Sequence, residues 1–502
     1  MDLEQIRSSY FELVEKLRRE YLANRRGLQD TVNSTALYKH YDWTYSLDSI
    51  TVVKVELDKA TGDRKRQLLF LLRALTNAHI DAQLAPFSDE LTSLSAKATI
   101  TWDGKDIPLR SVDNILKNEP DQKRRAALHA ACATWRELFS KKHADLWAKN
   151  DALCKTLGYN GYLDLNERLK QLRYEPLLKT ARQLLVGTQQ EHAMMLARET
   201  KNAGITTLHR YDMSYLLNDP TTKDKFPAER LIPFLRAFLK DFHTDFDTQT
   251  NITWDTESRS KKAPRACVFA IKPPHEIYVL TSPTAGMEDA RTLFHEAGHA
   301  EHYAHTDASL PDEFKLFGLN STTETWSYLF DHLFFNDEFL KTHTNLTPPE
   351  ITRTKEHRLF NELCFIRRYA AKCLYEHKFF TNDLRKLDER WEPTNDTYRD
   401  MGACYADILT RATGSIYEPI GYPTDIDPGF YTFEYFKAWM SEAQVRTHLE
   451  KIAGKTWWKT KKTIDIVKKL WSTGGKLNVD EITQSLGYPG LRVDELLIAL
   501  KV

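Results

Sequence analysis

The most reactive segment of this 502-residue chain is a run of eight residues with three histidines and two glutamates. It reads His-Glu-Ala-Gly-His-Ala-Glu-His and occupies residues 295–302. His295 and His299 are four positions apart, so on a helix their imidazoles lie on one face and can bind one zinc ion. Glu296 lies beside them and can accept a proton from a zinc-bound water. The segment therefore predicts a hydrolytic zinc site.

A catalytic zinc ion usually has three protein ligands and one exchangeable position. We expect the third ligand to be Glu324, in the first turns of a helix predicted within residues 318–331. Three rival ligands are also close in sequence: His302, His305 and His332. The longer pattern HExxHxxGxxH fits only in part, because His305 matches its last histidine while His302 replaces its glycine.

Two further residues are candidates for supporting the ligands. Asp331 follows Glu324 by about two helical turns and could accept a hydrogen bond from a ligand imidazole. An exposed or locally paired carboxylate is an equally good interpretation of Asp331. His302 lies nearly one turn after His299, so we expect it behind the ligands or at the surface.

The elements that must position these residues can also be predicted. Residues 287–302 form the expected metal helix, for which Asp289 is a plausible N-cap. Two short strands, 266–271 and 276–280, precede it and form a hairpin. Elsewhere the apolar spacing predicts helices over 4–26, 64–82, 122–157 and 176–201, a second hairpin over 98–109 and a loop over 248–264. The predicted fold class is mainly α with a small sheet.

Composition excludes several classes of protein. Lys plus Arg equals Asp plus Glu at 70 each, so no basic surface indicates a nucleic-acid partner. No apolar run is long enough to span a membrane, and the start of the chain does not resemble a signal peptide. We therefore expect a cytoplasmic protein. The six cysteines are scattered and do not form a disulfide framework.

Residues 295–302 fit throughout the motif HExGHxxH, and thereby resemble the thimet oligopeptidase and oligoendopeptidase F family of zinc metallopeptidases. The segment Glu324-Thr-Trp-Ser is similar to the segment that holds this family's third ligand. The resemblance implies one Zn²⁺ per chain, bound by His295, His299 and Glu324, with Glu296 as the general base. It also implies a two-lobed helical zincin with a deep channel, which we expect to divide into an N-terminal lobe, 1–200, and a catalytic lobe, 201–502.

The resemblance extends to a tyrosine-rich segment, 429–439, where the family places a donor to the oxyanion. Tyr435 is the best match and Tyr431 the second, although both could instead be aromatic core residues. The preceding stretch, 422–429, has no histidine and departs from the family's thimet branch, which indicates a divergent member.

The family also binds peptides along a strand near the metal helix. The resemblance assigns this role to Glu276, Ile277 and Tyr278, because an exposed sheet edge can pair with an extended peptide through its main chain. A fully paired strand is the alternative for this segment.

Three functions remain open from the sequence. The first is a zinc oligopeptidase that hydrolyses internal bonds of short peptides. The second is a metallocarboxypeptidase of the Taq type, which would need an arginine such as Arg411 or Arg446 to bind the peptide carboxylate. The third is a non-catalytic helical protein that binds peptides. No pattern in the sequence indicates the oligomeric state.

Overall fold

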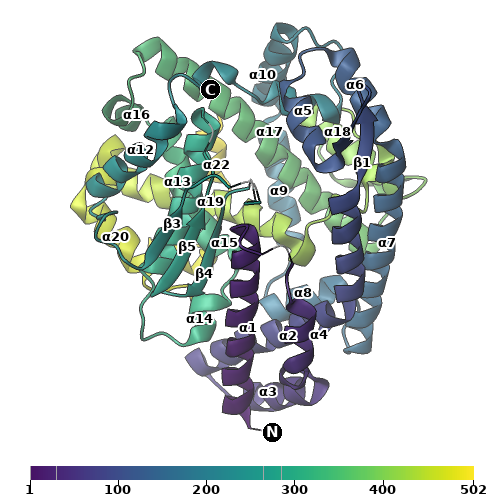
Figure 1. The fold of residues 1–502 in the computed structure, drawn as a ribbon, viewed down its shortest axis with the longest axis vertical. Coiled ribbons are helices and arrows are strands. Elements are labelled where there is room, and N and C mark those ends of the chain that lie inside the picture. Colours follow the sequence, from purple (N-terminus) through teal and green to yellow (C-terminus); the bar gives the residue numbers. More distant parts are fainter. Residues whose placement is uncertain (1, 30, 260, 264, 284, 502) are drawn as a thin grey trace. The chain divides into compact units, whose positions relative to one another are not determined.

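A computed structural model describes residues 2–29, 31–259, 261–263, 265–283 and 285–501 of the chain (Figure 1). Within these residues helices dominate and the strands form three small sheets, which confirms the predicted fold class. The chain forms two compact units. The first unit comprises residues 1–82, 219–358 and 437–496, and the second comprises 83–218, 359–436 and 497–502.

These units do not follow the predicted division at residue 200. The first 82 residues belong with the segment that carries the histidine motif, and residues 359–436 belong with the middle of the N-terminal half. Three long helices contribute residues to both units: α4 (Gly62–Lys97), α17 (Pro348–Thr381) and α19 (Tyr431–Ala453). A helix that continues across a boundary leaves no Gly- or Pro-rich linker in the sequence, so composition could not locate it.

The remaining elements of the first unit are as follows. They are α1 (Leu3–Arg25), α2 (Ser34–His40), α3 (Leu47–Lys59), α12 (Ala228–Asp241), β3 (Ile252–Asp255), β4 (Cys267–Lys272), β5 (Glu276–Leu280), α13 (Met287–Ala304), α14 (Asp312–Leu316), α15 (Asn320–Asp331), α16 (Asp337–His343), α20 (Lys461–Trp471) and α21 (Val479–Ser485). Helix α22 (Asp494–Ala499) begins in the first unit and ends in the second.

The second unit contains the other helices and the two remaining hairpins. They are β1 (Thr99–Trp102), β2 (Lys105–Pro108), α5 (Val112–Asn118), α6 (Gln122–Ala131), α7 (Ala133–Thr156), α8 (Tyr162–Lys170), α9 (Glu175–Gly187), α10 (Gln189–Asn202), α11 (Met213–Leu216), β6 (Arg385–Leu387), β7 (Pro393–Thr397) and α18 (Met401–Thr413). The hairpin of β1 and β2 confirms the one predicted over 98–109.

The sheet of the first unit has the strand order β3-β5-β4. Strands β4 and β5 form the predicted antiparallel hairpin. Strand β3 pairs with β5 in parallel and lies within 248–264, which the sequence predicted to be a loop. The prediction was wrong there because β3 has only four residues and pairs with a segment far along the chain. Such a strand has too few residues to show an alternating pattern.

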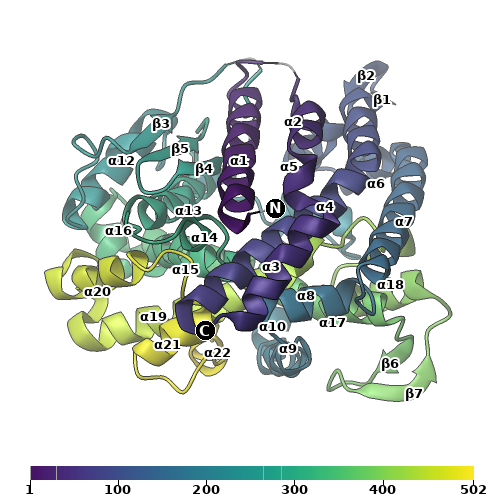
Figure 2. The same ribbon diagram turned by 90° about the horizontal axis from the view of Figure 1, so that it is seen from below.

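Each face of this sheet is covered by a helix, and the side chains of β5 alternate between them. Ile277 and Val279 pack with Ala300 of α13. On the opposite face Leu280 packs with Leu22 of α1. Figures 1 and 2 both show α1 lying along β4. The sheet is therefore a thin layer between α1 and the helix that carries the histidine motif.

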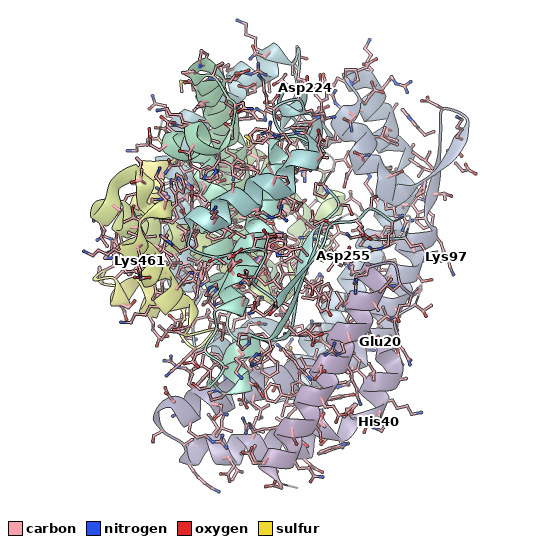
Figure 3. The ribbon with its side chains drawn as sticks, turned by 60° about the vertical axis from the view of Figure 1, so that its left-hand side comes forward. Glu20, His40, Lys97, Asp224, Asp255 and Lys461 are labelled. Carbon is pink, nitrogen blue, oxygen red and sulfur yellow. The ribbon has the colours of Figure 1, made fainter. Side chains whose placement is uncertain are left out.

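A buried ammonium group fixes the end of this sheet. Lys262 Nζ donates hydrogen bonds to the main-chain oxygens of Asp255, Glu257 and Thr281 and to Asp255 Oδ1, at 2.7–2.9 Å. Asp255, labelled in Figure 3, also accepts a hydrogen bond of 2.8 Å from Arg26 Nε. Burial opposes the charge of Asp255, but Arg259, Lys262 and Arg26 hold the pKa of its carboxyl well below the usual range. These contacts join β3, the end of β5 and α1 just before the chain enters α13.

Two long helices predicted in the second unit are each divided in the structure. The segment 122–157 breaks at Cys132, whose ψ of 0° ends α6. The segment 176–201 breaks at Thr188. There the buried guanidinium of Arg367 donates hydrogen bonds to Leu185 O and Thr188 Oγ1, at 2.6 and 2.8 Å. A tertiary contact of this kind satisfies helix-end groups without any signal in the local sequence.

No described helix has both the length and the apolar character needed to cross a membrane. All six cysteines have free thiols, and all except Cys267 are buried.

The second unit should lose stability in acid because His192 is buried. Burial and the charge of Arg367 lower the pKa of His192 to about 3, so the unfolded chain takes up a proton more readily than the folded one. The stabilisation is complete above about pH 6.5 and falls by about 1.4 kcal/mol per pH unit below it. We expect His192→Asn to reduce this loss, measured by urea unfolding followed by circular dichroism at about pH 7 and about pH 5.

The exposed His40 provides the control. His40→Asn should leave the difference between the two pH values unchanged. An unchanged difference in His192→Asn would contradict the assignment.

Candidate metal centre

Helix α13 begins just after Gly286, whose φ of 105° favours glycine and turns the chain into the helix. Asp289 is not the N-cap, as the sequence suggested. It lies in the first turn, and its Oδ2 accepts a hydrogen bond of 3.1 Å from Ala285 N. A carboxylate in this turn still interacts favourably with the helix dipole. The start of α13 is thereby tied to the segment that precedes it.

The structure brings His295, His299 and Glu324 together, and their potential ligand atoms all lie within 4.8 Å of one another. Glu324 Oε2 is 3.4 Å from His295 Nε2 and 3.7 Å from His299 Nε2. A tetrahedral zinc ion with bonds of about 2.0–2.2 Å places its ligand atoms roughly 3.3–3.6 Å apart. The two distances from Glu324 are close to this spacing, so the carboxylate and the two imidazoles form a donor set that suits such an ion.

Gly298 explains how a residue of α15 reaches these histidines. A Cβ atom added at Gly298 would lie 2.6 Å from both Ser327 Cα and Trp326 O of α15. Only a residue without a side chain allows α13 and α15 to approach so closely. The glycine within the histidine motif therefore places the carboxylate of Glu324 between His295 and His299.

Thr323, next to Glu324, orients one imidazole. His299 Nδ1 lies 2.8 Å from Thr323 Oγ1. If Nδ1 carries the proton and donates it to the hydroxyl, Nε2 presents its lone pair towards Glu324 and His295. Burial lowers the pKa of His299 to about 4, so the ring is neutral near pH 7, as a metal ligand requires.

Asp331 lies behind His295, where the sequence predicted a supporting carboxylate. Its Oδ2 is 3.8 Å from His295 Nδ1, which is close enough for an ionic interaction but too long for a direct hydrogen bond. Hydrogen bonds from Arg291, at 2.5 Å, and Arg358, at 2.9 Å, fix its position. Burial opposes the charge of Asp331, but the two guanidinium groups keep its pKa well below the usual range.

Glu296 is buried, and it interacts electrostatically with His295 and Glu324. Burial, and to a lesser extent the neighbouring Glu324, raise the pKa of Glu296 to about 7, although His295 opposes the shift. A carboxyl group with a pKa near the pH of the reaction is suited to accept and return a proton. Such a shift at a group beside three potential ligands is typical of an active site.

His302 is buried and packs between α13 and neighbouring segments. It is 2% exposed, and its Nε2 donates a hydrogen bond of 3.2 Å to Gly474 O. Its ring lies against Tyr303 and Trp326. This contact packs α13 against the segment after α20 and excludes the surface position that was one of the two expectations. A role for His302 behind the ligands stays a prediction.

The predicted substrate strand is not an edge. Strand β5, with Glu276, Ile277 and Tyr278, is paired on both sides, with β3 and with β4. Glu276 also accepts two hydrogen bonds of 2.7 Å from Arg19 of α1. These residues cannot pair with a peptide through their main chain, because neighbouring strands already occupy both edges. The alternative of a fully paired strand is correct, and β4 is an edge strand instead.

The two predicted oxyanion donors lie in the second unit, in the first turns of α19. The rings of Tyr431 and Tyr435 are 4.6 Å apart, and Tyr435 also contacts Tyr369 at 5.2 Å. Both are half-buried within this aromatic group. Their role in the reaction remains a prediction.

Sequence reasoning missed several residues around the centre. Thr323 and the two arginines at Asp331 were not selected. Tyr328 was also missed, although its ring lies 5.4 Å from His295 and stacks on Trp439 at 4.9 Å. Its position four residues after Glu324 places it on the same face of α15, and this spacing was a usable signal.

Comparison with known proteins supports the fold but not a close relationship. No protein-family model and no curated protein matches the sequence. A structure at 3.1 Å assigned as an oligoendopeptidase F is 15% identical, with a TM-score of 0.65 over 100% of this chain and 95% of that chain. One assigned as an oligoendopeptidase F from Bacillus anthracis str. Ames is also 15% identical, with a TM-score of 0.66 and the same coverage. The chain therefore has the oligoendopeptidase F fold along its whole length.

Gly298→Ala should destabilise the first unit. The added methyl group would meet main-chain atoms of α15, which cannot move aside as a flexible side chain can. We expect a loss of about 1–3 kcal/mol in the free energy of unfolding, measured by thermal or urea unfolding.

Thr292→Ala, at a partly exposed position of the same helix, is the control and should have a small effect. If Gly298→Ala were as stable as the unchanged chain, the close approach of α13 and α15 would not depend on this glycine.

Proposed function

We propose that the chain is a zinc-dependent oligopeptidase of the oligoendopeptidase F type, which hydrolyses internal bonds of short peptides. The observation that carries the proposal is the convergence of His295, His299 and Glu324 on one point, with Glu296 beside them. The fold supports the proposal, because the two structures of this fold described above are assigned as oligoendopeptidases.

His295, His299 and Glu324 would hold one zinc ion. When bound, such an ion polarises a scissile carbonyl and lowers the pKa of water. The chain supplies the rest. Thr323 orients the imidazole of His299 through a hydrogen bond, and Asp331 places a negative charge behind that of His295. Glu296 accepts a proton from the attacking water and returns it to the leaving amine.

Strand β4 is the better candidate for peptide binding. Burial, followed by the negative charge of Glu296, raises the pKa of Cys267, so the start of β4 lies near the proposed base. Further along this strand, Arg18 of α1 donates a hydrogen bond to Ala270 O. An extended peptide would therefore pair with the outer edge near Cys267, before Arg18 occupies it. Such main-chain pairing tolerates many side chains.

We retain Tyr435, and after it Tyr431, as the proposed donors to the oxyanion. A phenol O–H aimed at the developing negative charge would stabilise the tetrahedral intermediate. The arginines that a carboxypeptidase would need have other partners. Arg411 donates to Leu387 O and Asp388 O, at 2.8 and 2.6 Å, and Arg446 donates to Glu442 at 2.8 Å. Internal cleavage is therefore the preferred reaction.

Metal content tests the ligand assignment directly. The purified chain should contain about one zinc ion, which Glu324→Ala should greatly reduce because it removes one of about three protein ligands. Thr323→Val keeps the ligands but removes the hydroxyl that orients His299, so we expect zinc affinity to fall about 10–100-fold. Elemental analysis and competition with a chelator measure both effects.

Thr325→Val on the same helix is a matched control, because the hydroxyl of Thr325 is bonded to Ser321 O and not to a histidine. Its zinc affinity should be unchanged. Equal zinc content in all variants would exclude this site.

Glu296→Gln separates catalysis from metal binding. The amide cannot accept the proton, so cleavage of quenched fluorescent peptides should fall by at least about 100-fold. Zinc content should remain close to that of the unchanged chain. Mass spectrometry of the products should show internal fragments; stepwise loss of single C-terminal residues would identify a carboxypeptidase instead.

A further inference from the structure

The second unit contains a cavity of about 790 Å³ that is lined entirely by its own residues. The end of α4, helices α6 and α7, the turn at 209–211 and the segment 416–424 after α18 form its walls. Cavities of roughly 300–1,000 Å³ are typical of binding sites for small organic molecules. None of the proposed zinc ligands lines this cavity, so the mechanism proposed above gives it no role.

The cavity has an excess of positive charge. Arg110, Arg136 and Arg210 line it, together with a single carboxylate, Glu418. Arg136 donates a hydrogen bond to Glu418, and His129 Nε2 lies 3.2 Å from the same carboxylate. Glu418 is therefore already engaged at this side of the cavity.

The guanidinium groups of Arg110 and Arg210 donate no hydrogen bond to a carboxylate among the described residues. Arg210 lies over the ring of Tyr417, at 5.8 Å, and its charge also acts on the buried carboxylate of Asp425, which does not line the cavity. Both arginines are exposed at the cavity wall. A cavity with excess arginine concentrates anions, and a guanidinium group can bind a carboxylate through two parallel hydrogen bonds.

One wall of the cavity is aromatic and apolar. The ring of Tyr211 stacks on His209 at 4.9 Å with an interplanar angle of 8°, and lies 4.7 Å from His129. Burial and the charge of Arg136 lower the pKa of His129, which keeps its ring neutral near pH 7. Ile416, on the same cavity, remains 39% exposed. These groups offer a flat apolar surface to a ligand.

We propose that this cavity binds an organic carboxylate with an aromatic or apolar body. The carboxylate binds to Arg110 or Arg210, and the body packs against Tyr211 and Ile416. A free aromatic acid and the C-terminal residue of a peptide share this chemistry. If the ligand is a peptide end, the cavity serves the proposed peptidase as a second contact with its substrate or product, and this part of the inference rests on the proposed function.

The first test compares N-acetyl-L-phenylalanine with its amide, which has the same body and no charge. Isothermal titration of the full chain should show saturable binding of the acid, with the amide at least about tenfold weaker. The zinc-depleted chain and His299→Ala should bind the acid equally well. Loss of binding on zinc removal would place the acid at the metal centre and overturn the proposal, whatever the peptidase activity.

The second test changes the cavity itself. Arg110→Gln combined with Arg210→Gln should weaken binding of the acid at least about tenfold and leave binding of the amide unchanged. Ala96→Trp, at the end of α4, fills the cavity and should weaken binding of both compounds. Unchanged affinity for the acid in both variants would overturn the proposal.

The matched control removes two arginines of the same unit outside the cavity. Arg173→Gln combined with Arg399→Gln makes the same change in net charge, at side chains that are 78% and 81% exposed. This control should bind the acid normally. An equal loss of affinity in the control would reduce the effect to long-range electrostatics and overturn the assignment to Arg110 and Arg210.

A third comparison distinguishes the two sources of the carboxylate. In Glu296→Gln, peptides ending in phenylalanine are compared with their C-terminal amides. If peptides with a free carboxylate bind more tightly than their amides, and this difference disappears when Arg110 and Arg210 are both replaced, the cavity binds peptide ends. No such preference, with N-acetyl-L-phenylalanine still bound, assigns it to free aromatic acids.

Discussion

The metal centre depends first on the close approach of α13 and α15 at Gly298. A side chain at this position would meet the main chain at Trp326 and Ser327, and would move α15 away from α13. The carboxylate of Glu324 would then move away from His295 and His299, because Glu324 lies on the same helix, less than one turn before Trp326 and Ser327. The tolerance is small, since ligand atoms must lie within a few tenths of an ångström of the positions that one ion requires.

Charge is the second constraint on this centre. Three carboxylates, Glu296, Glu324 and Asp331, influence the protonation of His295. Burial of negative charge is costly unless cations compensate it. Arg291 and Arg358 compensate Asp331, which stays ionised. For Glu296, burial and the charge of Glu324 act in the same direction and favour the protonated form. A divalent cation beside Glu324 would instead favour the ionised form of Glu296 and lower its pKa. Metal binding and ionisation of the proposed base would therefore support each other.

Sequence reasoning recovered the features of the site that are local in the chain. The spacing of His295 and His299 follows from one turn of helix. The usual number of zinc ligands requires a third, which the family resemblance placed at Glu324. The two hairpins and the ends of α1 were also predictable from local patterns. The order of the strands was not, because β3 pairs with β5 across about twenty residues of intervening chain and only this pairing makes β5 central. The choice of β5 as the substrate strand failed for that reason.

The compact units differ from the predicted division at residue 200 for a related reason. Segments far apart in the sequence support the metal centre. Helix α1, from the first residues of the chain, covers one face of the sheet. On α13, Phe294 packs in a core that also includes Trp471 of α20, near the other end of the chain. A motif of five residues can be read locally because the ion imposes its spacing. The packing that holds α13 against α15 and the sheet imposes no spacing on the sequence, and for that reason only the structure could assign residues 1–82 and 437–496 to the metal centre.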